Sequence, residues 1–114
     1  MIRAGRLRNR LVLERVRETR DTHGGFVEEW YVVGDHPLWA AIRNPTDRET
    51  HRADALEVRA SVVVELRDRI HIGATDRFRR PDGALLNVGA VLEPEKPGEA
   101  LLVLCTEPRA EDDP

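Results

Sequence analysis

The sequence has 114 residues, with 40% hydrophobic residues, 34% charged residues and a formal net charge of -3. This length is enough for one domain with a single core and leaves no room for a second. No apolar run approaches the roughly 20 residues that a membrane span needs, and the N-terminal MIRAGRLRNR lacks the apolar stretch of a secretory signal. We therefore expect a protein that does not contact membranes and is used in the cytoplasm. Cys105 is the sole cysteine, which excludes an intrachain disulfide, and its apolar neighbours indicate a buried thiol.

The two ends of the chain carry opposite charges. Residues 1–20 contain seven Arg against two Glu, whereas residues 93–114 contain seven acidic residues against one Lys and one Arg. This polarity suits head-to-tail contact between identical subunits and also contact with nucleic acid. Two solvated ends would give the same pattern.

The first half of the chain contains three predicted strands. Residues 7–16 alternate apolar and charged side chains with a period of two, which is typical of a half-buried strand. The sequence DTHGG at 21–25 suits a turn, and residues 26–33 resume a mixture of β-branched and aromatic residues. We predict a long hairpin from these segments. After a break at 34–37, residues 38–43 predict a short third strand.

A short helix is predicted over residues 47–55. Thr46 and Glu49 have the spacing of a capping box, in which each side chain binds the other residue's backbone N–H. The helix sequence DRETHRADA offers only Ala53 and Ala55 as apolar contacts. We expect this helix to be weakly docked and mobile.

The second half of the chain predicts four more strands. Alternation is cleanest over residues 56–66, and short strands follow at 77–80, at 85–92 after the turn sequence PDG, and at 101–105. The last segment is continuously apolar, so we expect it to be buried on both faces. Because so small a chain rarely covers both faces itself, we expect a partner to cover one of them.

These elements predict a mainly β fold, namely a small antiparallel β-barrel or sandwich of six to seven strands with one short helix. Alternating βαβ units are missing from the pattern. We expect residues 1–107 to form the domain and residues 108–114 to form an acidic, disordered tail.

The sequence offers no equipped active site. Ser61 is the sole serine and has no flanking glycines of a nucleophile elbow, and Gly24-Gly25 lacks the pattern of a phosphate-binding loop. Four histidines are scattered singly, without the spacing of a metal motif: His23, His36, His51 and His71. We therefore expect no catalytic residue, no cofactor and no metal, and a protein that acts by assembling with others.

Nucleic-acid binding is the main alternative. Small barrels bind single strands by stacking bases on aromatic side chains above a basic groove. The aromatic residues here are few, and we expect Trp30, Tyr31 and Trp39 to serve in a core or an interface rather than in base stacking. The basic residues that would line such a groove are Arg8, Arg10, Arg15 and Arg17.

The order of several short motifs resembles the phage head-tail joining family, also called head closure or stopper proteins, of tailed phages and phage-like gene transfer particles. The resemblance covers residues 3–107. In the first half it is carried by Gly5-x-Leu7-Arg8-x-Arg10-Leu11, Asp21-x-x-Gly24-Gly25, Trp30 and Trp39-Ala40. In the second half it is carried by Glu65-Leu66-Arg67, Ile70, Arg77, Asp82-Gly83, Val88 and Cys105-Thr106-Glu107.

The resemblance implies a small β-barrel that forms a ring of six or twelve copies in the neck of a virion or phage-like particle, assembled in the bacterial cytoplasm. The expected partners are portal or adaptor proteins on the head side and tail terminator or tail proteins on the other, with packaged double-stranded DNA passing non-specifically through the lumen. Another neck component, an adaptor or a tail terminator, is the nearest alternative.

The resemblance also implies that the variable segment at about 44–55 projects into the channel and helps to retain DNA. The candidate channel residues are Asp47, Arg48, Glu49, His51 and Arg52. The candidate contacts with other subunits or neighbours are Arg8, Arg10, Trp30, Trp39, Leu101 and Val103.

Overall fold

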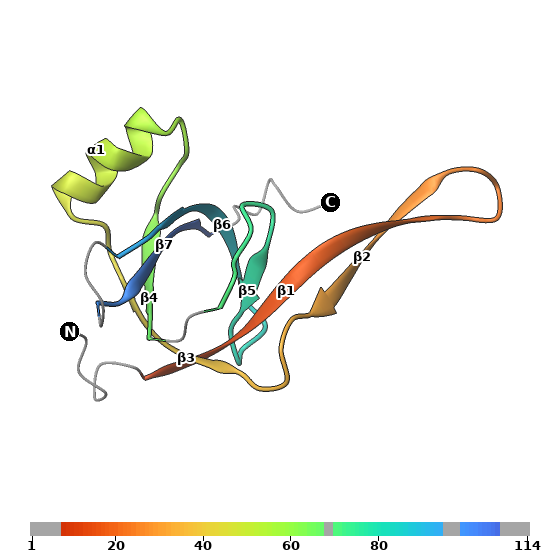
Figure 1. Cartoon of the computed structure of the whole chain (residues 1–114), viewed down its shortest axis with the longest axis horizontal. Coiled ribbons are helices and arrows are strands. Elements are labelled where there is room, and N and C mark those ends of the chain that lie inside the picture. Colours follow the sequence, from red (N-terminus) through yellow and green to blue (C-terminus); the bar gives the residue numbers. More distant parts are fainter. Residues whose placement is uncertain (1–7, 68–69, 95–98, 108–114) are drawn as a thin grey trace.

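The computed structural model describes residues 8–67, 70–94 and 99–107. Within these ranges the chain forms seven strands and one helix (Figure 1). Their bounds are β1 Asn9–Arg20, β2 Phe26–Val32, β3 Leu38–Arg43, α1 Asp47–Ala55, β4 Val62–Leu66, β5 Arg77–Arg79, β6 Leu85–Leu92 and β7 Leu101–Thr106. Of the predicted segments, Leu7 and the tail at 108–114 lie outside the described residues. No helix in the described ranges is long and apolar enough to cross a membrane.

Six of the strands close into an antiparallel barrel, which is one of the two mainly β folds that the sequence predicted. The sheet order is β2-β1-β3-β4-β7-β6-β5, and β5 also pairs with β1 to close the ring of strands. Residues Val12, Leu13 and Glu14 of β1 pair with Arg79, Phe78 and Arg77 of β5 in this closing contact. Strand β2 is outside the closed barrel, and β1 is its one pairing partner among the described strands.

The barrel interior is filled by side chains from all six of its strands. Phe78 is the largest fully buried residue, and Leu11, Leu13 and Leu86 pack around it with at most 1% of their surface exposed. A β-barrel this narrow is a packed core rather than a pore. DNA therefore has no path through a single subunit.

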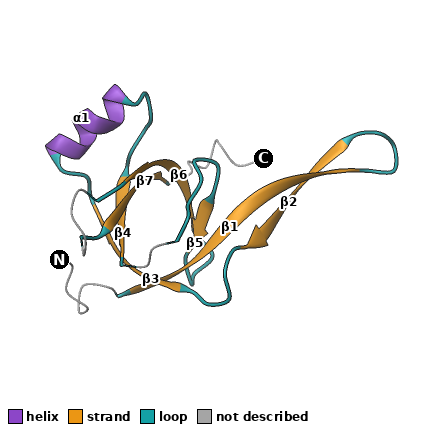
Figure 2. Cartoon of the chain, in the orientation of Figure 1, coloured by secondary structure: helices purple, strands orange, loops and turns teal. Residues whose placement is uncertain are grey.

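A second, smaller apolar layer lies on the outside of β4 and β7. Val63 and Leu104 point outward from these strands and are fully buried, because Ala53 of α1 packs on them. Figure 2 shows the helix on this side of the barrel. The chain's own helix thus covers the outer face of β7 at Leu104, whereas Leu102 on the same face stays half-buried.

Residues 56–61 are not part of a strand, contrary to the prediction of one strand over 56–66. Leu56 ends α1, and Glu57 adopts a left-handed conformation with φ of 57°. The chain then returns across the outside of the barrel, where Val58 and Ala60 pack on the outer apolar layer. The alternation of apolar and polar residues in this segment therefore arises from contact with the outer layer and not from pairing in a sheet.

Gly89 allows this return segment to lie close to the barrel. It sits at a bulge in β6 between Val88 and Ala90. A Cβ atom on Gly89 would lie 3.3 Å from the carbonyl oxygens of both Arg59 and Leu104. Glycine removes this crowding and lets the segment cover the outer layer.

The predicted helix and its capping box are confirmed. The Thr46 hydroxyl accepts a hydrogen bond from the Glu49 backbone N–H at 3.2 Å, and the Glu49 carboxylate accepts one from the Thr46 N–H at 2.9 Å. Only Glu49 and Ala53 of α1 are buried, so the helix makes few apolar contacts, as its sequence indicated.

Replacing Thr46 by Ala removes one half of the capping box. We expect the free energy of unfolding to fall by about 1 kcal/mol, the usual cost of losing an N-cap side chain. Thr50→Ala is the matched control, because Thr50 is exposed within the helix and Ala has the higher helix propensity. Urea denaturation of both variants checks this, and equal stability of the two would contradict the role of the cap.

Candidate functional site

The most prominent surface feature is an arm formed by residues 15–32. It consists of the distal part of β1, the turn at 21–25 and the whole of β2, and it extends away from the barrel (Figure 1). The predicted hairpin is confirmed: Arg20 pairs with Phe26, and the register runs back to Glu14 and Val32. Asp21 holds the turn by accepting hydrogen bonds from the backbone of His23 and Gly25, both at 2.8 Å.

Every residue of β2 is exposed, although the strand is rich in apolar and aromatic side chains. Large apolar side chains on the arm and on the neighbouring strand β3 expose a third to two thirds of their surface: Phe26 67%, Val27 44%, Trp30 37%, Tyr31 38%, Val32 57% and Trp39 51%. Strand register places Phe26, Trp30 and Val32 on one face of the arm and Val27 and Tyr31 on the other. Large exposed apolar residues of this kind are typical of contact sites for other proteins. Trp30 and Trp39, both predicted interface residues, are available for such contacts.

One face of the arm's base is held by a charged network on the outside of the barrel. Glu14 accepts hydrogen bonds from Arg77 at 2.8 Å and from Arg79 at 3.0 Å. Burial opposes ionisation of Glu14, but the two arginines outweigh it and lower its pKa. The Arg77 guanidinium lies 3.8 Å from the centre of the Trp30 ring. Trp30 is therefore stacked on an arginine that Glu14 keeps in place.

The opposite face of the arm's base is held by Arg15. Its guanidinium donates to both carboxylate oxygens of Asp76, at 3.0 and 2.9 Å, and to the His71 carbonyl at 3.1 Å. Asp76 is buried, which by itself raises its pKa. The hydrogen bonds from Arg15 and from the Gly73 N–H have the opposite effect, and the net result is a lowered pKa. Both faces of the base are thus fixed, whereas the described residues give the distal arm no support beyond its own two strands.

The arginines suggested for a single-strand groove do not form one continuous surface. Arg10 lies over Trp39, with its guanidinium 5.4 Å from the ring centre. Arg15 and Arg17 lie on the other face of β1, where Asp76 and Glu29 respectively pair with them. Arg8 also has an interaction with another residue. This arrangement gives little support to base stacking above a basic groove.

The helix α1 is fixed to the barrel by a second charged network. Arg43 of β3 donates to both carboxylate oxygens of Glu49, at 2.6 and 2.7 Å, and also pairs with Glu65 of β4. The hydrogen bonds from Arg43 lower the pKa of Glu49 to about 2, against the opposing effect of burial. The hydrogen bond to Glu49 is also the main cause of the raised pKa of Arg43. The helix is thus more firmly docked than its apolar residues predicted.

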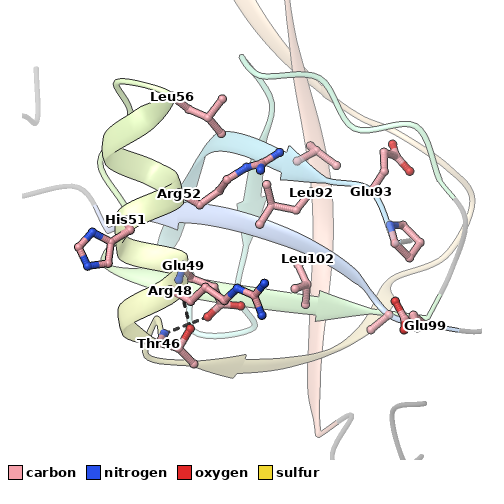
Figure 3. A pocket seen from close by; sticks show the side chains of 13 residues that line it. Thr46, Arg48, Glu49, His51, Arg52, Leu56, Leu92, Glu93, Glu99 and Leu102 are labelled. Atoms are coloured by element: carbon pink, nitrogen blue, oxygen red, sulfur yellow. Dashed lines mark hydrogen bonds between the residues drawn. The ribbon is translucent and has the colours of Figure 1, made fainter. Parts of the chain in front are cut away.

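An open groove lies between α1 and the neighbouring ends of β6 and β7 (Figure 3). We call it the outer groove. Leu56, Leu92 and Leu102 are among its apolar side chains. Arg48 and Arg52 reach over these leucines from the helix, and His51 lines the edge of the groove with its ring directed away from the leucines (Figure 3). Glu93 and Glu99 lie on the side opposite the helix.

The predicted channel residues separate into different environments. Glu49 is 8% exposed and bound to Arg43, so it is a structural residue and was wrongly assigned to the channel surface. Asp47, Arg48, His51 and Arg52 are exposed. Arg48 and Arg52 line the outer groove from one side of the helix.

Two of the predicted interface residues are inside the barrel. Leu101 is 4% exposed and Val103 is fully buried, and both belong to the interior core. Alternation along β7 turns their neighbours Leu102 and Leu104 outward instead. The assignment of Leu101 and Val103 to an interface is therefore corrected, and Leu102 is the half-buried residue of this strand that lines the groove.

Two features of the site were missed from the sequence. One is the exposure of the whole of β2, for which the sequence carries no signal, because an exposed and a buried strand of this composition look alike. The other is the network around Arg43. The sequence did contain an indication of this network, namely Glu65, an acidic residue inside the apolar run VVVEL. A buried carboxylate there would destabilise the fold unless a cation paired with it.

Comparisons with known proteins agree with this architecture. The chain is similar to the solution structure of protein SF1141 from Shigella flexneri 2a, with 30% sequence identity and a TM-score of 0.69 over 93% of this chain and 96% of that one. A search of curated proteins finds no significant match. The family model described as phage head completion protein matches residues 2–108, nearly the whole chain. The chain therefore belongs to the phage head completion protein family.

Proposed function

We propose that this phage head completion protein forms a homo-oligomeric ring through which packaged DNA passes. Membership of the family gives the chain a role in joining head and tail in the neck of a phage-type particle, with other head and tail proteins as its partners. The proposal adds three points to that role: a ring of six or twelve copies, the retention of packaged DNA and the conduction of that DNA.

The packed barrel interior is the observation that carries this proposal. Fourteen buried residues of the described ranges form the inner cluster, so DNA leaving the head would pass between subunits and not through one. A closed arrangement of several copies around the DNA meets this need. The exposed apolar residues of the arm supply the kind of surface on which such copies, or the neighbouring neck proteins, would pack.

The exposed side of α1 is our candidate for the surface that faces the DNA. Asp47, His51 and Asp54 lie along the side away from the buried residues Glu49 and Ala53. Two carboxylates on this side would repel phosphates, and a channel that must let DNA move cannot bind it tightly. We place a DNA-facing role on this side of the helix alone.

Electron microscopy of particles made with and without the gene tests the proposal. Without the protein we expect heads that lack tails and have lost DNA, and we expect the full chain supplied in trans to restore tailed, filled particles. Tailed, filled particles in the absence of the protein would contradict the proposal. Three-dimensional reconstruction of the restored particles should show a ring at the neck, and its symmetry would give the copy number. A single copy of the protein per particle would contradict the ring.

A further inference from the structure

The outward face of the arm carries a pair of like charges between two aromatic residues. Glu18 of β1 and Glu28 of β2 are directly opposite each other, and the next pairs on the same face contain Phe26 and Trp30. Among the described residues neither carboxylate forms an ion pair or accepts a hydrogen bond. Like charges opposite each other destabilise a strand pair, so this face is unfavourable in the isolated subunit and would gain from a basic partner.

The outer groove carries the complementary charges. Arg48 and Arg52 are four residues apart on α1, where their like charges destabilise the helix. In the described part of the chain neither arginine pairs with an acidic residue. Leu56, Leu92 and Leu102 lie beside them, and Leu56 exposes 45% of its surface. As far as the described residues show, the groove thus combines two arginines that form no ion pair with an exposed apolar surface.

The two surfaces match in spacing as well as in charge. Opposite residues in an antiparallel pair have Cβ atoms roughly 4.5 to 5.5 Å apart, and residues four apart on a helix have Cβ atoms roughly 5 to 6 Å apart. The two carboxylates can therefore reach the two guanidinium groups at the same time. Phe26 and Trp30 would then lie near the leucines of the groove, and Arg20, opposite Phe26, would lie near Glu93 or Glu99.

We propose that the arm of one subunit docks with this face in the outer groove of a second copy of the chain. The proposal rests on the ring proposed above and names its subunit contact. The arm and the groove lie at opposite ends of the long axis of the molecule (Figure 1). Two different surfaces at opposite ends make a head-to-tail contact, which closes into a ring when the rotation between subunits allows it. The glutamates of the arm favour this partner over DNA, which they would repel.

Paired cysteines test the contact directly, because the chain has no other accessible thiol. Cys105 is fully buried, and burial raises the pKa of its thiol to about 12. We expect Glu28→Cys combined with Arg52→Cys to form disulfides between subunits in purified tailed particles after mild oxidation. Non-reducing electrophoresis would then show a ladder of covalent oligomers that ends at the ring size.

Two control variants have the same number of cysteines. Glu29→Cys with Arg52→Cys places the first thiol on the opposite face of the arm. Glu28→Cys with Asp54→Cys places the second thiol on α1 but outside the groove. Neither should give the ladder. No ladder from the test pair, or an equal ladder from the controls, overturns the arm contact. Because these particles carry tails, such a result leaves the proposed ring function intact.

Charge exchange separates a second copy from DNA as the occupant of the groove. We expect Arg52→Glu or Glu28→Arg alone to lower the yield of tailed, filled particles by about tenfold or more, since like charges would meet in the contact. Combining the two restores the opposite charges and should recover most of the yield. If Arg52→Glu causes DNA loss that Glu28→Arg does not correct, the groove faces DNA and the proposal is wrong.

Discussion

Replacing Arg43 by Met is expected to lower the free energy of unfolding by about 3 kcal/mol at pH 7. Arg43 is the only cation within hydrogen-bond distance of both Glu49 and Glu65 among the described residues. Its loss removes the guanidinium that binds both carboxylate oxygens of Glu49 and also pairs with Glu65, two carboxylates that are 8% and 6% exposed. Breaking a buried ion pair by removing one partner costs roughly 3 to 5 kcal/mol. We place the expected loss at the lower end because the Arg43 side chain is 27% exposed.

Arg17→Met is the matched control for this prediction. Arg17 pairs with Glu29 at 3.4 Å on the arm, where the two side chains are 61% and 50% exposed. An exposed pair of this kind contributes less than about 1 kcal/mol. Urea denaturation of both variants measures the difference. A loss in the Arg43 variant no larger than that in the Arg17 variant would mean that the network does not hold α1 to the barrel.

The elements of the fold could be predicted because each has a local cause. Alternation in β1, the turn sequence at 21–25 and the Thr46–Glu49 capping box depend on neighbours within a few residues of each other. The helix bounds agree with the predicted 47–55. Closure of the barrel by β1 and β5 joins residues more than 60 positions apart. Local patterns carry no information on that contact, so the sequence could limit the fold only to a barrel or a sandwich.

The errors arise where two different surroundings give the same sequence pattern. Val58 and Ala60 alternate with polar residues because they cover the outer layer, as residues of a strand would. In β7 both faces are buried, so the pattern could not tell Leu101 and Val103, which face the interior, from Leu104, which lies under α1. The sequence therefore identified the right strand but placed the wrong side chains at its surface.

The candidate site was predicted only in part because it depends on long-range placement. Trp30 and Trp39 were assigned to an interface by composition, and both are exposed. The pairing of Glu18 with Glu28, and the position of Arg48 and Arg52 above the groove leucines, follow from strand register and from the docking of α1. Neither is visible before the fold is known.

Acid is expected to remove the contribution of Glu49 selectively. The pKa of Glu49 is lowered from an ordinary 4.5 to about 2 in the folded protein, so its ionised form stabilises the fold at pH values above about 4.5. This stabilisation is lost as the pH falls from about 4.5 to about 2, because over this range the unfolded state binds a proton at Glu49 while the folded state stays ionised. At 1.36 kcal/mol per pKa unit, the contribution at pH 7 is about 3 kcal/mol.

Glu49→Gln tests this assignment, since glutamine keeps the shape and the capping role of the side chain but not its charge. The variant should be about 3 kcal/mol less stable than the natural chain at pH 7, and the two should become equally stable near pH 2. Glu28→Gln makes the same chemical change on the exposed arm, where it removes a like charge opposite Glu18, so it should not lower stability at any pH in this range. Thermal unfolding followed by circular dichroism between pH 2 and 7 measures both differences. A difference for Glu49→Gln that does not change with pH would show that its charge does not attach α1 to the barrel.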